Sequence, residues 1–189
     1  DEVLKDRIYS RRSGGGLTLS GGECLCQPEF SAVLLRAAQE SGLNTAIEST
    51  ACAPMETIRR LLPYLDHYLM DIKHIDREKH RRFTTRDNDL ILQNAALLAK
   101  EARHLIIRVP VVPGFNDTES EIAGIARFTA GILPGGEIHL LPYHRLGTDK
   151  YRGLNREYTL SEILPPPDEK MQQLKAVAED FGLRCQIGG

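Results

Sequence analysis

The chain has 189 residues, of which 24 are lysine or arginine and 26 are aspartate or glutamate, so its net charge is -2. A nearly neutral chain has no global field that attracts nucleic acid or an anionic membrane, and we expect neither as a partner. Apolar runs stay far below the ~20 residues of a membrane span, and the first residues are too charged for a signal peptide. We therefore expect a soluble, cytoplasmic protein with one core.

Taken in chain order, β-branched apolar runs alternate with amphipathic helical patterns. The predicted strands are 17–20, 44–48, 67–72, 104–110, 137–141 and 184–187. The predicted helices are 28–41, 54–62, 89–103, 118–132 and 168–181. The basic run 73–86 contains interleaved acids, which favours a solvated loop and the start of a helix.

Local signals delimit these helices. Pro28 and Pro54 suit a first helical turn, and Thr118 with Glu121 predicts a capping box. Glycines 42 and 182 fall where a left-handed C-cap is expected. Repeated strand–helix units predict a parallel sheet, which is either an open doubly wound sheet or part of a (β/α) barrel.

The chain contains four cysteines: Cys24, Cys26, Cys52 and Cys185. They are too few and too scattered for a disulfide framework. The pair Cys24-x-Cys26 could bind a metal, but a closed thiolate site usually has four ligands and no second cysteine or histidine pair lies nearby at a useful spacing. We interpret this pair as structural.

Polar residues fall at the carboxyl ends of the predicted strands, where both candidate folds bind ligands. They are Glu23, Glu48, Ser49, Asp71, Lys73, Arg108 and His144. Gly21-Gly22-Glu23 offers bare backbone beside a carboxylate, which suits a ligand with an ammonium group. A tight turn with a solvated glutamate explains this tripeptide about equally well.

The other candidates also have two interpretations. Asp71 and Lys73 are two apart, so on a strand they share a face, where they could hold a zwitterion or simply pair with each other. Glu48 and Ser49 offer hard oxygens for a cation, or form a turn. His144 could bind a ribose or act as an acid or base, or it could be an ordinary surface histidine.

Four segments in this order, SGGGLTLSGGE, YLMDIK, RVPVVPGFND and LLPYHRLGTDKY, resemble the glycyl-radical-enzyme activating enzymes, such as that of pyruvate formate-lyase. The resemblance implies a radical S-adenosylmethionine enzyme on a partial (β/α) barrel of parallel strands, formed by residues 1–189 as one domain. It implies a 4Fe-4S cluster that reduces S-adenosylmethionine, and a radical that removes hydrogen from a glycine of a partner enzyme. A flavodoxin- or ferredoxin-type reductant is implied as well.

The resemblance also implies roles for single residues. Gly21, Gly22 and Glu23 match the motif that receives the methionine amino group. Asp71, Ile72, Lys73 and His144 match segments that line S-adenosylmethionine. Ser49 falls beside the methionine carboxylate, and Glu48 with Asp71 falls at a monovalent cation. Arg108 matches an arginine near the partner's glycine loop and is the candidate catalytic residue.

This sequence departs from the family's pattern in one major respect. The cluster motif CxxxCxxC is absent, and the four cysteines cannot form it. Without three thiolates the cluster has no anchor, so this chain alone is expected to be inactive. The chain also begins with an uncapped helical pattern and no preceding strand, so we expect a partial chain whose barrel is incomplete at the N-terminus, with the cluster ligands in a missing N-terminal segment.

Smaller departures remove no proposed ligand. Cys24 stands where many relatives have proline, Thr85 where the family often has glycine, and Asn155 replaces a frequent glycine. Two other functions stay open: a non-catalytic subunit that binds S-adenosylmethionine and a partner, and a metal-dependent hydrolase or lyase. The latter would use Glu23, Glu48, Asp71 and His144.

Overall fold

The structure is a computed structural model that describes residues 14–144 and 163–189. It contains β1 (Gly16–Leu19), β2 (Asn44–Ser49), β3 (His67–Asp71), β4 (Leu105–Val111), β5 (Glu137–Pro142) and β6 (Arg184–Ile187). The strands form one sheet in the order β1-β2-β3-β4-β5-β6, and the pairs β1–β2, β2–β3 and β5–β6 are parallel. This confirms the predicted α/β class. A doubly wound sheet reverses its strand order, so the consecutive order decides for the partial barrel.

The chain divides into two compact units. The first contains the chain up to Ile72 and Asp87–Ile107, and the second contains Lys73–Arg86 and the chain from Arg108 onward. In the part of the chain that the structure describes, each unit has its own buried apolar side chains. The prediction that residues 1–189 form one domain stays a prediction.

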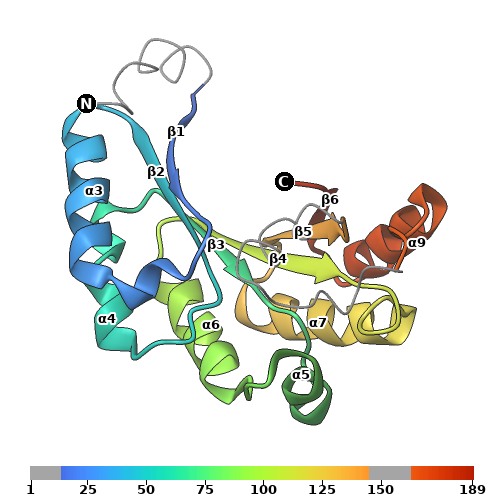
Figure 1. Cartoon of the computed structure of the whole chain (residues 1–189). Helices are drawn as coiled ribbons and strands as arrows, with labels where there is room; N and C mark the ends of the chain where they lie inside the picture. Colours follow the sequence, from blue (N-terminus) through green and yellow to red (C-terminus); the bar gives the residue numbers. More distant parts are fainter. Residues whose placement is uncertain (1–13, 145–162) are drawn as a thin grey trace. The chain divides into compact units, whose positions relative to one another are not determined.

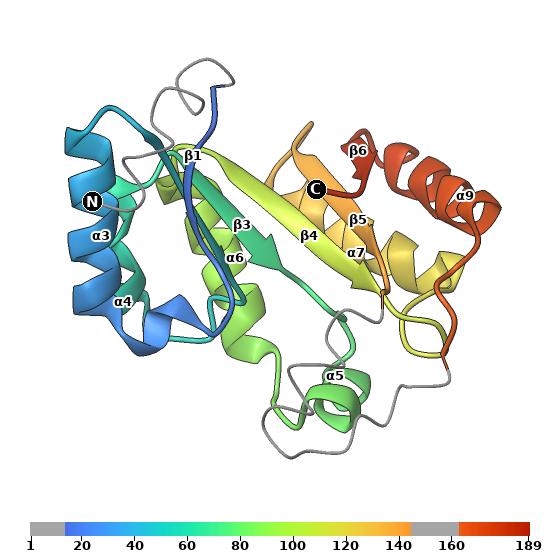
Figure 2. The ribbon, with the colours of Figure 1, turned by 45° about the horizontal axis from the view of Figure 1, so that its top comes forward.

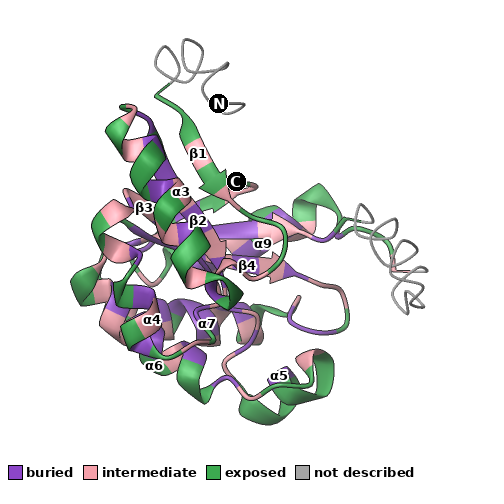
Figure 3. Ribbon diagram, turned by 60° about the vertical axis from the view of Figure 1, so that its left-hand side comes forward, coloured by how far each residue is buried: buried purple, intermediate pink, exposed green. Residues whose placement is uncertain are grey.

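In the first unit, helices cover one face of β1, β2 and β3 (Figure 1). They are α3 (Pro28–Glu40), α4 (Met55–Arg59) and α6 (Asp89–Glu101), with short 3-10 turns η1 (Cys24–Cys26) and η2 (Leu62–Tyr64). Along β2, Thr45, Ile47 and Ser49 are buried while the residues between them are more exposed. Alternate side chains of a strand point to opposite faces, so this pattern identifies the face that packs on the helices. Figure 3 shows buried and exposed residues alternating along α3.

The second unit contains α5 (Arg77–Thr84), α7 (Glu119–Ile132) and α9 (Asp168–Glu179). Helix α9 packs on α7, β5 and β6, and Figure 2 shows α7 and α9 close to these strands. Ile122 and Ile125 of α7 and Leu174 of α9 are at most 1% exposed, so an apolar helix face is buried here. The capping box predicted for Thr118 and Glu121 is present at the start of α7.

Most sequence-based boundaries agree with the structure within two residues, and two helices differ. The helix predicted at 54–62 ends at Arg59, and the next turn is the separate η2. Pro63 lies in η2 and has no N–H to continue an α-helix, which explains the break. Helix α5 is a full eight-residue helix although only its start was expected; the Asp76 carboxylate caps it by accepting from Lys79 N at 2.8 Å.

Thr85 ends α5 in a left-handed conformation, with φ 63° and ψ 9°. A β-branched residue is strained there by roughly 1–2 kcal/mol, whereas glycine is not. We therefore expect Thr85→Gly to raise the free energy of unfolding by about 1 kcal/mol, measured by urea denaturation. Thr84→Gly, inside the same helix, should lower it. If the Thr85→Gly protein is no more stable than its parent, the claim that the Thr85 backbone is strained is contradicted.

Candidate functional site

The turn after β1 places open backbone at the carboxyl end of the strand. Gly21 has φ +105°, a conformation that residues with a Cβ rarely adopt, and a Cβ added at Gly21 or Gly22 would meet no atom within 4 Å. Within the part of the chain described, no backbone hydrogen bond of either glycine is found. The backbone groups of this turn are therefore accessible to a ligand.

The carboxylate of Glu23, which follows this turn, accepts four hydrogen bonds from oxygen and nitrogen donors. Its Oε1 accepts from Ser49 Oγ at 2.7 Å and from Leu25 N at 3.2 Å, and its Oε2 accepts from Thr50 Oγ1 at 3.0 Å and Thr50 N at 3.2 Å. An ionised carboxylate offers about four lone-pair sites. Glu23 is thus nearly saturated as an acceptor, and a ligand ammonium would meet the glycine backbone more readily than this carboxylate.

Two weak acids surround Glu23 and remain protonated. The Cys24 thiol lies 3.8 Å from Glu23 Oε1, and burial together with that carboxylate raises the pKa of Cys24 to about 12. Burial also raises the pKa of Tyr68, which is 1% exposed, and the Ser49 hydroxyl opposes part of this rise. A thiol with this pKa is a poor nucleophile at neutral pH.

The segment after β2 is strained where it contacts Glu23. Ala51 is fully buried and has φ 56°, the left-handed region. Its N–H donates to Ser49 Oγ at 2.9 Å, and its carbonyl accepts from Asn94 Nδ2 at 2.7 Å. Strain of this kind persists only where neighbours enforce it, and it is frequent at functional sites.

Glu48 and Ser49, which were predicted to act together, point to opposite faces of the sheet. Ser49 is 4% exposed on the helix-covered face, where it donates to Glu23. Glu48 lies on the other face and accepts from Ser20 Oγ at 2.5 Å. Its pairing partner on β3 is Leu69, so Asp71, two residues further along, shares the face with Glu48. The two carboxylates proposed for a cation therefore lie on one face, without Ser49.

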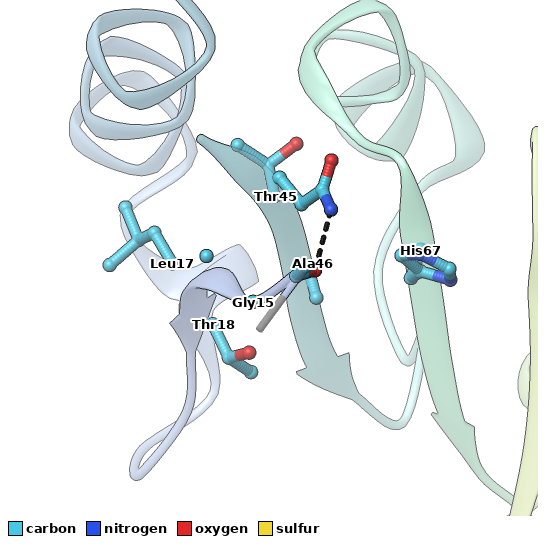
Figure 4. Close-up of a pocket in the computed structure, with 9 residues that line it drawn as sticks. Gly15, Leu17, Thr18, Thr45, Ala46 and His67 are labelled. Carbon is cyan, nitrogen blue, oxygen red and sulfur yellow. Dashed lines mark hydrogen bonds between the residues drawn. The ribbon is translucent and has the colours of Figure 1, made fainter. Parts of the chain in front are cut away.

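Among the described residues of the first unit, two hollows lie against β1. One, of about 320 Å³, is lined by residues of β1, the glycine turn and α3, including Gly22, Glu23, Gln27 and Phe30. The other, of about 160 Å³, lies at the amino ends of β1, β2 and β3 beside His67 (Figure 4). Asn44 Nδ2 donates there to Gly14 O at 2.7 Å. Active sites of (β/α) barrels lie at the carboxyl ends, so the first hollow is the one at the candidate site.

The remaining predicted residues divide between the units. Asp71 ends β3 in the first unit, and the Ile72 side chain is 1% exposed, so only its backbone could line a ligand. Lys73, Arg108 and His144 belong to the second unit. The first two are half-buried and His144 is exposed.

Lys73 begins a network in the second unit. Its carbonyl accepts from Asn116 Nδ2 at 2.8 Å, and the next residue, His74, is 5% exposed. His74 Nδ1 accepts from Asp76 N at 2.9 Å, so Nε2 carries the hydrogen and faces Glu121 Oε1 at 3.5 Å. Glu121 also accepts from Lys79 Nζ at 2.6 Å.

The carboxyl group of Glu121 should make the free energy of unfolding depend on pH in the acid range. Burial opposes its ionisation, but hydrogen bonds from Lys79, Thr118 and His74 prevail and lower its pKa from 4.5 to about 2. A depressed folded-state pKa stabilises the protein above about pH 4.5, and this contribution is lost as the pH falls toward 2. Urea unfolding across this range should show the loss, and Glu121→Gln should reduce it. Glu119→Gln, exposed on the same first turn, should keep the parent's profile; equal profiles for all three would contradict the assignment.

Sequence reasoning missed several residues that build this site: Ser20, Thr50, Asn94 and Asn116. Thr50 follows directly on Ser49, and the strand-end rule that found Glu48 could have included it. Asn94 carries no local signal, because the two carbonyls that it bonds lie 43 and 41 residues away. Asn116 bonds Pro110 and Val112 within its own loop, but its contact with Lys73 spans 43 residues.

The described residues contain no group of three or more histidine, cysteine, aspartate or glutamate side chains arranged to hold a metal ion. Among them, no helix is long and apolar enough to cross a membrane.

Known proteins resemble this chain over nearly all of its length. The family model of the radical SAM superfamily matches residues 1–128. The chain belongs to this superfamily. A solved domain of the pyruvate-formate lyase-activating enzyme from Bacteroides vulgatus superposes with a TM-score of 0.77 and 32% identity, covering 93% of this chain and 99% of that one. This likeness supports the partial barrel.

Characterised relatives are activating enzymes. The indoleacetate decarboxylase activating enzyme of Tractidigestivibacter scatoligenes is 39% identical over 194 residues, which cover 99% of this chain and 60% of that protein. The isethionate sulfite-lyase activating enzyme of Desulfovibrio desulfuricans is 47% identical over 163 residues, which cover 85% of this chain and 52% of that protein. The resemblance to glycyl-radical-enzyme activating enzymes is thereby confirmed. The chain spans between half and two thirds of these relatives.

Proposed function

We propose that the protein containing this chain activates a glycyl radical enzyme, and that the chain supplies the S-adenosylmethionine site. The observation that carries this proposal is the open Gly21-Gly22 backbone, fixed by the hydrogen-bonded Glu23 at the carboxyl end of β1. The radical SAM match and the names of the relatives support the same reading.

The residues present suit the chemical groups of S-adenosylmethionine. Its ammonium would meet the backbone of Gly21 and Gly22, with Glu23 and Ser49 holding that turn in place. Its carboxylate suits the ammonium of Lys73, and its ribose hydroxyls suit Asp71 and the backbone of Ile72. His144 would complete the adenosine end, and Glu48 with Asp71 would bind a monovalent cation. The partial burial of Asp71 and Lys73 helps to exclude water from these contacts.

A 4Fe-4S cluster, when bound, supplies the electron that cleaves the sulfonium bond of S-adenosylmethionine. Its thiolate ligands would lie outside these 189 residues, because no CxxxCxxC occurs in them. The chain alone would accordingly bind the cofactor without cleaving it. Its own residues bind and orient S-adenosylmethionine, and Arg108 would lie near the partner's glycine loop.

The partner in this proposal is a large enzyme that carries the glycine to be activated. The relatives are named for different partners, a decarboxylase and a sulfite-lyase among them, and the solved domain for pyruvate-formate lyase. The common element is the activation, so we propose a glycyl radical enzyme as a class, with pyruvate formate-lyase as one candidate. A flavodoxin- or ferredoxin-type protein would deliver the electron.

The test uses the complete protein that contains this chain, purified without oxygen and reconstituted with iron and sulfide. Dithionite and S-adenosylmethionine are added, and 5′-deoxyadenosine and methionine are measured by chromatography. The proposal expects both products in equal amounts, and a glycyl radical signal in the electron paramagnetic resonance spectrum once a partner is added. A complete protein that binds S-adenosylmethionine but takes up no cluster and does not cleave the cofactor would instead favour the non-catalytic subunit.

A further inference from the structure

A buried asparagine connects the loop that follows β3 to the loop that follows β4. Asn116 is 0% exposed, and its Nδ2 donates to Lys73 O at 2.8 Å and to Pro110 O at 2.9 Å. Its Oδ1 accepts from Val112 N at 2.8 Å. The two N–H groups and the oxygen of this amide are therefore all used. Turning the amide over would set its oxygen against two carbonyls, so the observed orientation is the one its neighbours permit.

The loop that carries Asn116 is itself a stiff turn. Phe115 N and Asn116 N both donate to Val112 O, at 3.0 and 3.3 Å. Gly114, which has φ +77°, donates its N–H to Asp117 Oδ1 at 2.9 Å. Because this turn is internally bonded, Asn116 can hold the distant Lys73 carbonyl in a fixed place.

The residue that follows Lys73 is held as well. The buried His74 ring bridges Asp76 N and Glu121 Oε1, which ties the chain after Lys73 to the start of α7. His74 also packs on Phe115, with ring centroids 5.3 Å apart. The backbone from the Lys73 carbonyl to His74 is thus held, and this constrains the direction in which the Lys73 side chain leaves the loop.

We propose that Asn116 is a positioning residue for the binding of S-adenosylmethionine, acting through Lys73. The inference rests on the proposed function, which assigns the Lys73 ammonium to the cofactor's carboxylate. Without the Asn116 amide, the Lys73 carbonyl loses this hydrogen bond, and the peptide between Lys73 and His74 is held less firmly. A displacement of about 1 Å in a binding group is enough to lower affinity or rate substantially.

The experiment is a double-mutant cycle on the complete protein, with the dissociation constant of S-adenosylmethionine measured by calorimetry. Lys73→Ala and Asn116→Ala are each expected to weaken binding, by about tenfold. If Asn116 acts through Lys73, the double variant binds no more weakly than Lys73→Ala alone, because the positioned group is already gone. If Asn116 has a purely structural role, the fold-change in the dissociation constant of the double variant is instead the product of the two single fold-changes.

Asn94→Ala is a matched control. Asn94 is 1% exposed and its Nδ2 also bridges two carbonyls, those of Ala51 at 2.7 Å and Ala53 at 2.8 Å, in the other unit. Whatever fold-change in affinity Asn94→Ala causes, the double variant with Lys73→Ala should show the product of the two single fold-changes. Thermal unfolding of every variant identifies a temperature at which all are folded, and Asn116→Ser replaces Asn116→Ala in the cycle if the latter does not fold.

The outcomes separate the two proposals. If Lys73→Ala weakens binding but its effect multiplies with that of Asn116→Ala, the positioning role is overturned and the cofactor site stands. If Asn116→Ala leaves affinity unchanged while Lys73→Ala weakens it, the positioning role is likewise overturned. If Lys73→Ala itself changes nothing, Lys73 leaves the cofactor site, and the role of Asn116 is overturned with it.

Discussion

Replacement of Glu23 by alanine is expected to lower the free energy of unfolding by about 2–4 kcal/mol. The carboxylate accepts four hydrogen bonds, and its removal leaves the Ser49 hydroxyl and the Thr50 N–H without their acceptor. A buried donor without a partner costs about 1–3 kcal/mol, which is why the loss should exceed that of a surface glutamate. Urea denaturation of the variant and its parent measures the difference.

Glu23→Gln distinguishes a structural carboxylate from one that binds the ligand. The glutamine oxygen can still accept from Ser49 and Leu25, but its NH₂ group would face the Thr50 N–H. We expect roughly half of the alanine variant's loss of stability, and a loss of S-adenosylmethionine affinity below about tenfold. A stable Glu23→Gln protein with a much larger loss of affinity would show that the carboxylate contacts the ammonium directly. Glu29→Gln, on an exposed helix start, is the control for stability.

Loss of Asp71 or Lys73 is expected to weaken S-adenosylmethionine binding by about 1–3 kcal/mol, which is the usual scale for hydrogen bonds to charged groups. Both residues are partly buried at the end of β3 or directly after it, so bulk water screens their contacts with a ligand less than it would on the surface. Asp71→Ala and Lys73→Ala should each be titrated by calorimetry in the complete protein.

The control for this pair is Lys175→Ala on α9. Lys175 pairs at 3.7 Å with Glu179, one turn further along the same helix, and lies in no part of the proposed site. The affinity of the Lys175→Ala protein for S-adenosylmethionine should equal that of the parent protein. Unchanged affinity in both Asp71→Ala and Lys73→Ala would remove these two residues from the cofactor site.

Local patterns in the sequence were sufficient to predict most helices and strands. They also placed the candidate site residues at the carboxyl ends of the strands. Period-two alternation in 44–49 and the capping residues Thr118 and Glu121 depend on neighbours in the chain, so they could be read directly. Helix α5 was underestimated because its basic run resembles a solvated loop, although Asp76 is a regular N-cap. The opposite directions of Glu48 and Ser49 follow from the same alternation.

By itself, the sequence determined the α/β class, the order of the strands and helices, and the resemblance to a radical activating family. These follow from short-range periodicity and from motifs, which are properties of contiguous residues. Tertiary structure decided that the Glu23 carboxylate is occupied by Ser49 and Thr50, and that Asn116 holds Lys73. Such contacts join residues 26 to 43 positions apart, and only the packing of strands and loops determines which of many possible donors reaches each acceptor.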